Sequence, residues 1–204
     1  MKKVVIALLS VVLTTSCLSV HLNGSGIKCK GPVVVKDLEL KDFTSIVVNG
    51  SSDINLTQSD TYSVVVTANE EVFDHIDYRV EEGVLVIGTK KNITLRAEKY
   101  EIAIALPQLE SFIVNGAADL NQLSTYSSDK DLTMQVNGAG DLNIIGIKVP
   151  ALTFTANGAC DIKASGLDVQ SLVVNVNGAG DIDARNLECE SYTTHRAGVA
   201  SIRK

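Results

Sequence analysis

A five-residue motif recurs at a nearly fixed interval, and this recurrence limits the possible folds more than any other feature. The pattern Asn-Gly-Ala-X-Asp occurs four times, beginning at Asn115, Asn137, Asn157 and Asn177, at spacings of 22, 20 and 20 residues. A fainter copy, NGSSD, begins at Asn49, and a worn copy, AGVAS, begins at residue 197. A period near 20 residues indicates a repeat architecture in which each repeat packs mainly against its neighbours.

Apolar and polar residues alternate on both sides of the motif. Before the asparagine, one parity is apolar in each repeat: Leu132, Met134, Val136; Leu152, Phe154, Ala156; and Leu172, Val174, Val176. After the aspartate, Leu120, Leu142, Ile162 and Ile182 occupy one equivalent position. Such alternation is typical of half-buried strands. A second turn follows near Gly146 and Gly166, so each repeat holds two strands and two turns.

These repeats predict an all-β fold, a β-solenoid with about 20–22 residues per coil. Successive coils would stack as parallel strands about 4.8 Å apart. The inward residues would then form aliphatic rows, which explains how a core can form with 4 Phe, 5 Tyr and no Trp. The composition shows no break, and 204 residues suffice for one domain.

Residues 57–114 are less regular than the later repeats. The pattern predicts strands at 63–68 and 100–107 and a hairpin at 77–91 with its turn at Glu82-Gly83. Residues 69–76 predict a short helical insertion capped by Asn69. Because Asn49 precedes Asn115 by 66 residues, which is three periods of 22, we expect three imperfect coils in this region.

The N-terminus is typical of an export signal rather than of a folded segment. The chain begins with Met-Lys-Lys, and the ten-residue apolar run that follows is too short to span a bilayer, which needs about 20 apolar residues. We predict that residues 1–16 are a cleaved signal peptide and that Cys17 carries a lipid, with plain cleavage nearby as the alternative. Residues 17–34 would form a linker or first strand, and residues 35–204 the solenoid domain. The lipid would be the only membrane attachment, in the cell envelope.

The repeated motif predicts a structural turn rather than a phosphate-binding loop. Asn and Gly tolerate the positive φ that a sharp strand-to-strand turn demands, whereas a phosphate loop opens onto a helix whose N-terminus holds the anion. The Asp side chain can accept backbone N–H bonds across the same turn. The residues assigned to structural turns are Asn115, Gly116, Asp119, Asn137, Gly138, Asp141, Asn157, Gly158, Asp161, Asn177, Gly178 and Asp181.

The four aspartates of the motif would form one column. At a spacing of about 4.8 Å, two such charges repel by about 3–4 kcal/mol at an effective dielectric of 20, so they need solvation, hydrogen bonds or a cation. Calcium-binding solenoids use a nine-residue repeat, so we expect hydrogen-bonded carboxylates and neither metal nor cofactor. The cysteines lack CxxC spacing, which argues against zinc. Pairing of Cys29 with Cys160 or Cys189 remains open.

In the strands before the motif, the residues that alternate with the apolar ones, and so point outward, are mostly polar. They include Thr133, Gln135, Thr153, Thr155, Asn175 and His195. Such a face can bind a glycan or a protein, or it can simply be solvated. An ice-binding array is disfavoured because Val173 interrupts the column of threonines. The net charge is −6 without a basic stripe, which makes the chain a poor nucleic-acid binder.

The sequence offers little for catalysis. His21, His75 and His195 are scattered, and no Ser or Cys motif suggests a triad with them. Polysaccharide lyases and hydrolases with solenoid folds are the enzymatic alternative. They use clustered carboxylates or basic residues in a groove, commonly with aromatic platforms, and the regular coils contain no Trp. We therefore predict that the protein is not an enzyme.

Three features together resemble a known family. They are the run DHIDYRVEEGVLVIGTKK (74–91), the segment IAIALPQLESFIVNGAADL (102–120) and the repeated NGAGD turns. Over roughly residues 35–204 the chain resembles the head domain of putative autotransporter adhesins, common in gut Bacteroidetes. The resemblance implies a single-stranded, right-handed parallel β-helix similar in shape to pectin lyases, with no known catalytic residues. It also implies a role in cell adhesion.

One departure from that family concerns attachment to the cell. A true autotransporter ends in a membrane β-barrel, whereas this chain stops at SIRK (201–204), with a charged last coil that suits a terminal cap. A lipid on Cys17 would replace the barrel. We therefore expect an exported adhesion module that binds a glycan or a surface protein. The alternatives are an envelope scaffold without an external ligand and, less favoured, a polysaccharide-active enzyme.

Overall fold

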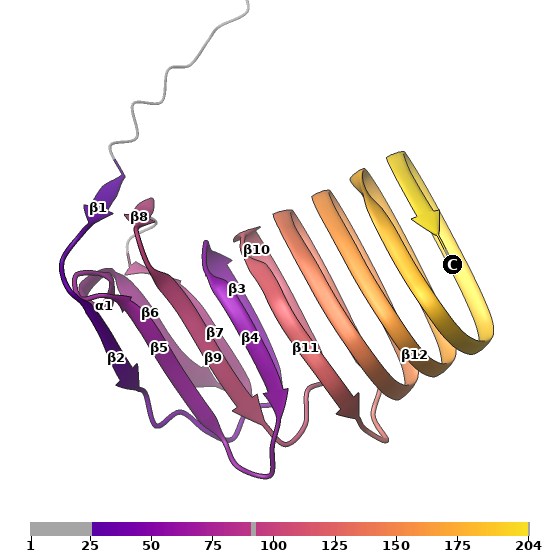
Figure 1. Cartoon of the computed structure of the whole chain (residues 1–204), viewed down its shortest axis with the longest axis horizontal. Coiled ribbons are helices and arrows are strands. Elements are labelled where there is room, and N and C mark those ends of the chain that lie inside the picture. Colours follow the sequence, from indigo (N-terminus) through magenta and orange to yellow (C-terminus); the bar gives the residue numbers. More distant parts are fainter. Residues whose placement is uncertain (1–25, 91–92, 204) are drawn as a thin grey trace, which may run out of the picture.

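The computed structural model describes residues 26–90 and 93–203, and nearly all of its elements are strands. Ten strands form one curled sheet in the order β2-β5-β9-β4-β11-β12-β10-β3-β7-β6, and β1 and β8 form a separate two-stranded sheet (Figure 1). The predicted all-β class is therefore confirmed. The predicted signal peptide, residues 1–16, and the predicted lipidation site, Cys17, lie outside the described residues.

The strands range in length from three residues, in β1 and β8, to 72 residues, in β12. In chain order the elements are β1 (Ile27–Cys29), β2 (Val33–Asp37), β3 (Ser45–Gly50), β4 (Asp53–Gln58), β5 (Ser63–Asn69), α1 (Val72–His75), β6 (Ile76–Glu81), β7 (Val84–Thr89), β8 (Leu95–Ala97), β9 (Tyr100–Leu106), β10 (Ser111–Ala117), β11 (Asp119–Ser127) and β12 (Leu132–Arg203). β12 contains 72 residues because its backbone pairs without interruption through several repeats. We use the word coil for one repeat of the chain, after which the next equivalent residue lies beside the first. The coils of β12 run from orange to yellow in Figure 1.

Equivalent residues of successive repeats lie side by side. β10 pairs in parallel with β12, so that Asn115 lies opposite Asn137. β11 also pairs in parallel with β12. Within β12 the side chains of Asn137 and Asn157, 20 residues apart in sequence, are hydrogen-bonded. The predicted parallel pairing of the repeats is therefore confirmed.

The coil of β3 and β4 does not lie where its place in the chain suggests. β3 pairs in parallel with both β10 and β7, and β4 pairs in parallel with both β11 and β9. Asn49 therefore lies directly opposite Asn115. The expectation of three coils between these two asparagines is wrong. After β4 the chain forms β5 to β9 on one side of the β3–β4 coil. It then continues with β10 and β11 on the other side of that coil.

Antiparallel strands close the N-terminal end of the stack. β5 pairs antiparallel with β2 and β9, and β6 pairs antiparallel with β7. The predicted hairpin is confirmed: the two-residue turn Glu82-Gly83, with φ of 50° and 77°, joins β6 to β7. A connection of two residues can join only antiparallel neighbours. This local constraint explains why the region does not continue the parallel coils.

The predicted helical insertion is α1, but Asn69 does not cap it. The N-cap position is Glu71, whose side chain makes no capping bond. Asn69 is instead buried, where it donates to the carbonyl of Gly31 at 2.8 Å and accepts the N–H groups of Glu98 and Lys99, each at 2.9 Å. Its amide therefore joins the loop before β2 to the loop between β8 and β9.

No helix within the described residues has the length and hydrophobicity needed to cross a membrane.

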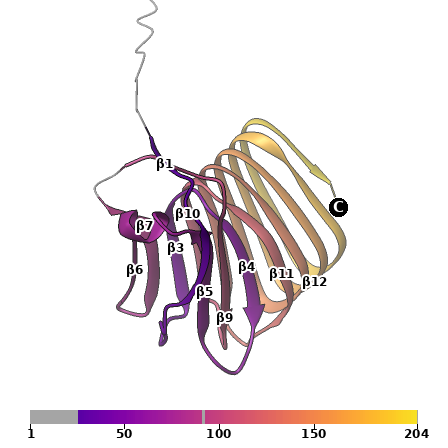
Figure 2. The ribbon, with the colours of Figure 1, turned by 60° about the vertical axis from the view of Figure 1, so that its left-hand side comes forward.

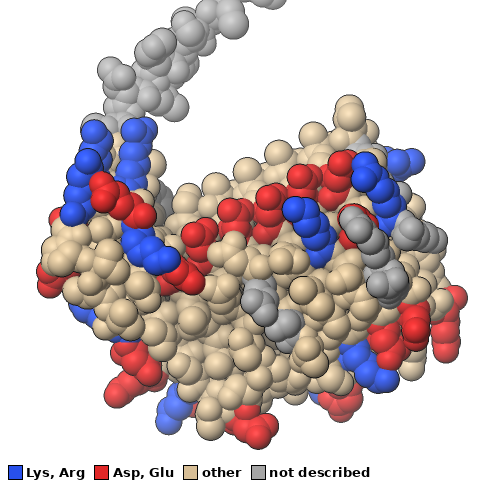
Figure 3. Space-filling view, in the orientation of Figure 1, with Lys and Arg blue, Asp and Glu red and all other residues tan. Residues whose placement is uncertain are grey.

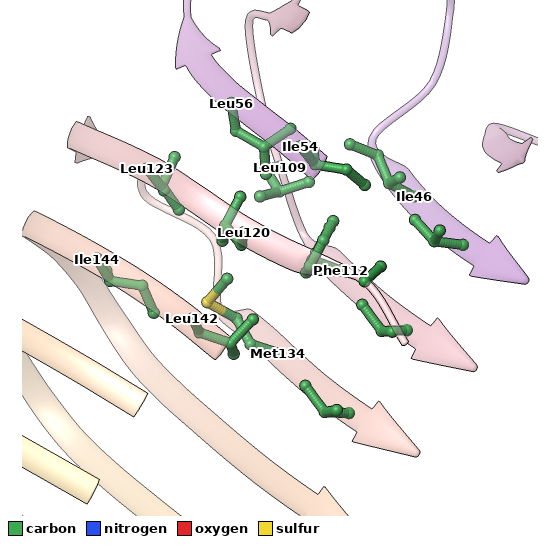
Figure 4. Close-up of a cluster of buried hydrophobic side chains, with 14 of the residues drawn as sticks. Ile46, Ile54, Leu56, Leu109, Phe112, Leu120, Leu123, Met134, Leu142 and Ile144 are labelled. Atoms are coloured by element: carbon green, nitrogen blue, oxygen red, sulfur yellow. The ribbon is translucent and has the colours of Figure 1, made fainter. Parts of the chain in front are cut away.

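Aliphatic side chains fill the space between the two sides of the coils. Figure 2 shows β3, β7 and β10 on one side and β4, β9 and β11 on the other. The close-up in Figure 4 shows the buried side chains of neighbouring strands in rows, with Ile54, Leu120 and Leu142 in one and Leu56, Leu123 and Ile144 in another. The predicted inward positions Leu120, Leu142, Ile162 and Ile182 are confirmed, since each is 1% exposed. Burial of this apolar surface, at about 25 cal/mol per Å², is the main force that holds the coils together.

Tyr126 in β11 carries a polar group into the core. Its side chain is fully buried. The Tyr126 hydroxyl donates to the carbonyl of Leu109 at 2.8 Å and accepts the N–H of Leu109 at 2.9 Å. Leu109 is also buried and lies in the connection between β9 and β10. The Tyr126 hydroxyl therefore pairs both backbone groups of Leu109, as the backbone of a neighbouring strand would do within a sheet.

The cysteines of the described residues are free, so Cys29 pairs with neither Cys160 nor Cys189. Cys29 and Cys160 are buried, whereas Cys189 is partly exposed. Burial, followed by the charges of nearby aspartates, raises the pKa of Cys160 to about 12. Since the thiolate is the reactive species, Cys160 is unreactive near neutral pH.

We therefore expect a thiol-specific chromogenic disulfide to label Cys189 first in the folded Cys17→Ser chain. Cys29 and Cys160 should react only after denaturation, because their thiols are buried. The Cys189→Ser variant should lose the fast phase and keep the slow one. Equal labelling rates for all three thiols in the folded protein would contradict the described burial.

Candidate functional site

The glycines of the repeated motif stand where successive coils approach most closely. Gly138, Gly158 and Gly178 have φ of 140°, 141° and 155°, values that are almost restricted to glycine. A Cβ atom on Gly158 would lie 2.0 Å from the carbonyl oxygen of Gly138, and one on Gly178 would lie 2.0 Å from that of Gly158. Backbone conformation and lack of space therefore both exclude a side chain. The motif also leads into a strand, so there is no helix N-terminus beside it to bind a phosphate.

The asparagines of the motif form a continuous column of hydrogen-bonded amides. We call it the asparagine ladder; its members, in spatial order, are Asn49, Asn115, Asn137, Asn157 and Asn177. Each Nδ2 donates to the Oδ1 of the asparagine before it, at distances of 2.8–2.9 Å. All four bonds have the same direction, so the amide dipoles align and reinforce one another. The donor end of the ladder is at Asn49, and the acceptor end is at Asn177.

Carboxylates form a second column, which crosses the coils diagonally in Figure 3. This acidic row consists of Glu101, Asp53, Asp119, Asp141, Asp161 and Asp181. The N–H of Asp141 donates to Asp119 Oδ1 at 2.9 Å, and that of Asp181 donates to Asp161 Oδ1 at 2.8 Å. These bonds join successive coils, whereas the sequence predicts bonds across a single turn. No three His, Cys, Asp or Glu side chains gather as metal ligands in residues 26–90 and 93–203.

Cations lie at the two ends of the acidic row. Lys99 Nζ is 2.5 Å from Glu101 Oε2, and Arg203 Nη2 is 3.9 Å from Asp181 Oδ2. Hydrogen bonds from Lys99 and then desolvation act on the Glu101 carboxyl, and the net result is a pKa below its usual value. The row is therefore solvated, bonded to backbone and partly compensated at its ends, as like charges at this spacing require.

The predicted binding residues lie on the outward side of β12. Thr133, Gln135, Thr153, Thr155 and Asn175 are half-buried, and His195 is exposed. We call these six residues the polar face. Gln135 Nε2 donates to Asn137 Oδ1 at 2.8 Å, and Asn175 Nδ2 donates to Thr155 Oγ1 at 3.4 Å. One of these bonds lies within a coil and the other joins two coils, and together they fix the orientation of polar groups on this face.

The same side of the sheet becomes aliphatic toward the N-terminal end. The position of Gln135 is occupied by Ile113 in the next coil, by Val47 in the one after it and then by Val86. All three aliphatic side chains are half-buried. Sequence reasoning missed this strip because it depends on the spatial order of β7, β3 and β10. The strip could have been found from the sequence only by aligning the segment VLVIG (84–88) with SIVVN (45–49), which have the same alternation of apolar residues.

A surface hollow of about 600 Å³ lies where this strip meets β6. We call it the Gly88 hollow; the lining residues that matter below are Asn49, Asp77, Arg79, Val86, Gly88 and Lys90. Arg79 bridges two carboxylates: its Nη1 contacts Asp77 Oδ2, and its Nε donates to Glu81 Oε1 at 2.8 Å. These bonds, that of Glu81 first, raise the pKa of Arg79. Of these residues only Asn49 was singled out from the sequence, as part of the repeated motif.

Ser52 is a buried residue whose hydroxyl is unpaired among the described residues. It is 7% exposed, and its Oγ makes no hydrogen bond to any residue of 26–90 or 93–203. The equivalent position of the next coil holds Ala118, since Asp53 lies opposite Asp119. An unpaired buried hydroxyl costs about 1–3 kcal/mol.

We therefore expect Ser52→Ala to raise the free energy of unfolding by about 1 kcal/mol, because the unpaired hydroxyl is removed and the methyl group matches Ala118. Equilibrium urea denaturation would measure the change. The neighbouring Ser51 is exposed, so Ser51→Ala should have an effect near zero. A loss of stability in Ser52→Ala would mean that the hydroxyl has a partner.

Solved structures share this fold. A putative adhesin from Bacteroides fragilis matches with a TM-score of 0.63 and 21% sequence identity, covering 87% of this chain and 99% of that one. A protein described as a putative lipid binding protein, from Parabacteroides distasonis, matches with a TM-score of 0.55 and 19% identity, covering 87% and 99%. No protein of curated function matches the chain.

A family model matches most of the chain itself. The model describes a putative auto-transporter adhesin, head GIN domain, and it matches residues 42–203. The matched region includes the asparagine ladder, the acidic row and the polar face. The chain therefore belongs to the family of the putative auto-transporter adhesin, head GIN domain.

Proposed function

We propose that the protein is an exported, non-enzymatic adhesion module that binds a glycan or a surface protein through the polar face. The supporting observation is the hydrogen bonding of that face. Its hydroxyl and amide groups project from parallel coils, and hydrogen bonds such as that between Asn175 and Thr155 hold them in place. A preorganised polar surface binds with a smaller loss of side-chain entropy than a flexible one.

The fold that we propose for residues 35–204 is a right-handed parallel β-helix. The parallel register of β10 and β11 with β12 and the 20-residue spacing of the amide contacts support it. In this proposal the twelve Asn, Gly and Asp residues predicted for the turns have a structural role, which is to hold successive coils together. The contacts of the glycine column, the asparagine ladder and the acidic row support that role.

Three further points of the proposal concern export, anchoring and the absence of catalysis. Membership of an adhesin family supports export to the cell surface. We propose that residues 1–16 are the signal peptide and that a lipid on Cys17 anchors the protein in the outer membrane. A non-enzymatic role is supported by the positions of His75, on α1 at one end of the molecule, and His195, near the end of β12 at the other end (Figure 1). Replacing Cys17 with serine should release the protein from membranes if the anchor is a lipid.

The binding test uses an array of glycans and extracellular-matrix proteins probed with the wild-type protein. We expect binding to at least one class of spot, and loss of that binding in the double variant Thr155→Lys, Asn175→Lys. Gln170→Lys is the matched control, because Gln170 is exposed and lies outside the polar face. An array without any bound spot would favour an envelope scaffold instead. Equal binding by the double variant and the control would place the contact elsewhere on the protein.

A further inference from the structure

The asparagine ladder ends at a position where a side chain is missing. Asn49 lies opposite Gly88 in β7, and Gly88 lies opposite Asp77 in β6. Every earlier step of this row carries an amide, so Gly88 leaves a gap one strand wide between Asn49 and Asp77. The gap opens into the Gly88 hollow.

The amide that faces this gap has an unused donor. Asn49 Oδ1 accepts from Asn115 at 2.9 Å, and no described residue accepts a hydrogen bond from Asn49 Nδ2. Because all the amides of the ladder point the same way, their dipoles add and make the N–H groups of Asn49 better donors. The near wall of the hollow therefore offers a strong donor to a ligand oxygen.

The far wall offers an acceptor and further donors. Asp77 uses one carboxylate oxygen for Arg79, which leaves the other as an acceptor in the hollow. Arg79 in turn has N–H groups beyond those that it gives to Asp77 and Glu81. The ligand can therefore accept from one wall and donate to the other, as a hydroxyl group does.

The spacing of the walls limits the size of the ligand. Asn49 and Asp77 are two strands apart, so their backbones are separated by about 9.5 Å. The missing side chain of Gly88 leaves open about one strand spacing between them, for a small group that contacts both walls. The hollow, at about 600 Å³, lies within the size range of small-molecule sites.

Charge and shape narrow the class of ligand further. Asp77 and Glu81 share Arg79, and Lys90 adds a second cation whose Nζ donates to the carbonyls of Phe73 and Asp74. Among the described lining residues Asp77 opposes Arg79 and Lys90, and Glu81, which lies outside the lining but is bonded to Arg79, compensates the remaining positive charge. Val86 supplies an apolar floor for the C–H groups of a ring.

We infer that the Gly88 hollow is a subsite for a neutral saccharide, with one hydroxyl oxygen accepting from Asn49 and another hydroxyl donating to Asp77. This inference rests on the proposed function, since it names a glycan as the partner and one place where it binds. Gly88 is the residue that creates the site, because any larger residue would continue the row and fill the gap.

The test fills the gap with the amide that the row lacks. Gly88 does not have a positive φ, and a Cβ atom there would lie 3.4 Å from Asn49 Cβ and farther from other atoms, so Gly88→Asn should fold. Val35→Asn is the matched control, because it adds the same amide at an exposed valine of β2, outside both the hollow and the polar face. The full chain and both variants are titrated with neutral oligosaccharides of glucose, mannose and galactose, with uronic-acid oligosaccharides as the charged comparison.

We expect wild type and Val35→Asn to bind a neutral oligosaccharide, and Gly88→Asn to bind it about tenfold more weakly or not at all. Equal binding by wild type and Gly88→Asn would overturn the subsite and leave the proposed function intact. So would binding of uronic-acid oligosaccharides alone. Absence of binding to every oligosaccharide by the wild type would overturn the subsite, and an array without any bound spot would overturn the proposed function as well. If thermal denaturation shows Gly88→Asn unfolded, Gly88→Ser, which adds two heavy atoms, replaces it in the comparison.

Discussion

Replacing Gly158 with alanine should lower the free energy of unfolding by about 3–5 kcal/mol, through backbone strain and overpacking together. The φ of 141° is unfavourable for alanine, and the new Cβ would lie 2.0 Å from the carbonyl oxygen of Gly138. The two coils would have to separate, which would weaken the parallel hydrogen bonds and the asparagine ladder beside them. Equilibrium denaturation with guanidinium would measure the loss.

Gly50 provides a matched control within the same column. Its φ of 140° equals that of Gly138, but the atom nearest to an added methyl group would be Thr89 Cγ2, at 3.9 Å. Gly50→Ala therefore has the strain of the backbone without the steric clash, and should cost about 1–3 kcal/mol. The difference between the two variants is the contribution of close coil stacking. Equal losses would show that backbone conformation alone restricts the column to glycine.

Tyr126→Phe should lower the free energy of unfolding by about 2–4 kcal/mol, because it leaves two buried backbone groups without partners. The hydroxyl bonds both the N–H and the carbonyl of Leu109, and both residues are buried. Phenylalanine preserves the ring and its packing, so the change isolates the two hydrogen bonds. Thermal and chemical denaturation would measure the effect.

Tyr62→Phe is the control for removing a tyrosine hydroxyl. Tyr62 is half-buried, and its ring packs against Phe43 with centroids 5.1 Å apart, an interaction that phenylalanine keeps. We expect this variant to stay within about 0.5 kcal/mol of the wild type, as for most changes at partly exposed sites. A loss in Tyr126→Phe no larger than this would mean that Leu109 finds other partners.

The regular repeats could be predicted from the sequence because their period is short and their pattern repeats. The alternation around Leu142 and Ile162 identifies the buried positions, and the recurrence of glycine identifies positions of positive φ such as Gly138 and Gly158. A period of 20 residues also places equivalent residues side by side, which the amide contacts of Asn137 and Asn157 demonstrate. Each of these inferences needs only local pattern and the geometry of a strand.

The N-terminal half could not be ordered in the same way. The interval of 66 residues between Asn49 and Asn115 fits three periods, yet the two residues are direct neighbours. Nothing in a periodic pattern distinguishes a chain that stacks steadily from one that leaves and returns. The turn at Glu82-Gly83 was the informative signal, because it requires an antiparallel pair and so breaks the sequence of parallel coils.

The candidate site was predictable only in part for the same reason. The polar face lies within one regular strand, so its residues follow from parity. The Gly88 hollow combines β3, β6 and β7, whose order depends on the return of the chain. Gly88 belongs to no motif in the sequence, and its role can be inferred only from its position between Asn49 and Asp77 in the sheet.

The displaced position of the β3–β4 coil has a consequence for how the chain folds. During synthesis or export this coil emerges first, but both of its neighbours come later, and its contact with β10 spans 66 residues of sequence. Closing so long a loop costs more entropy than closing one of 20 residues. We expect the region up to β11 to be the slow folding nucleus, after which the coils of β12 add rapidly, each on the surface that the previous one provides.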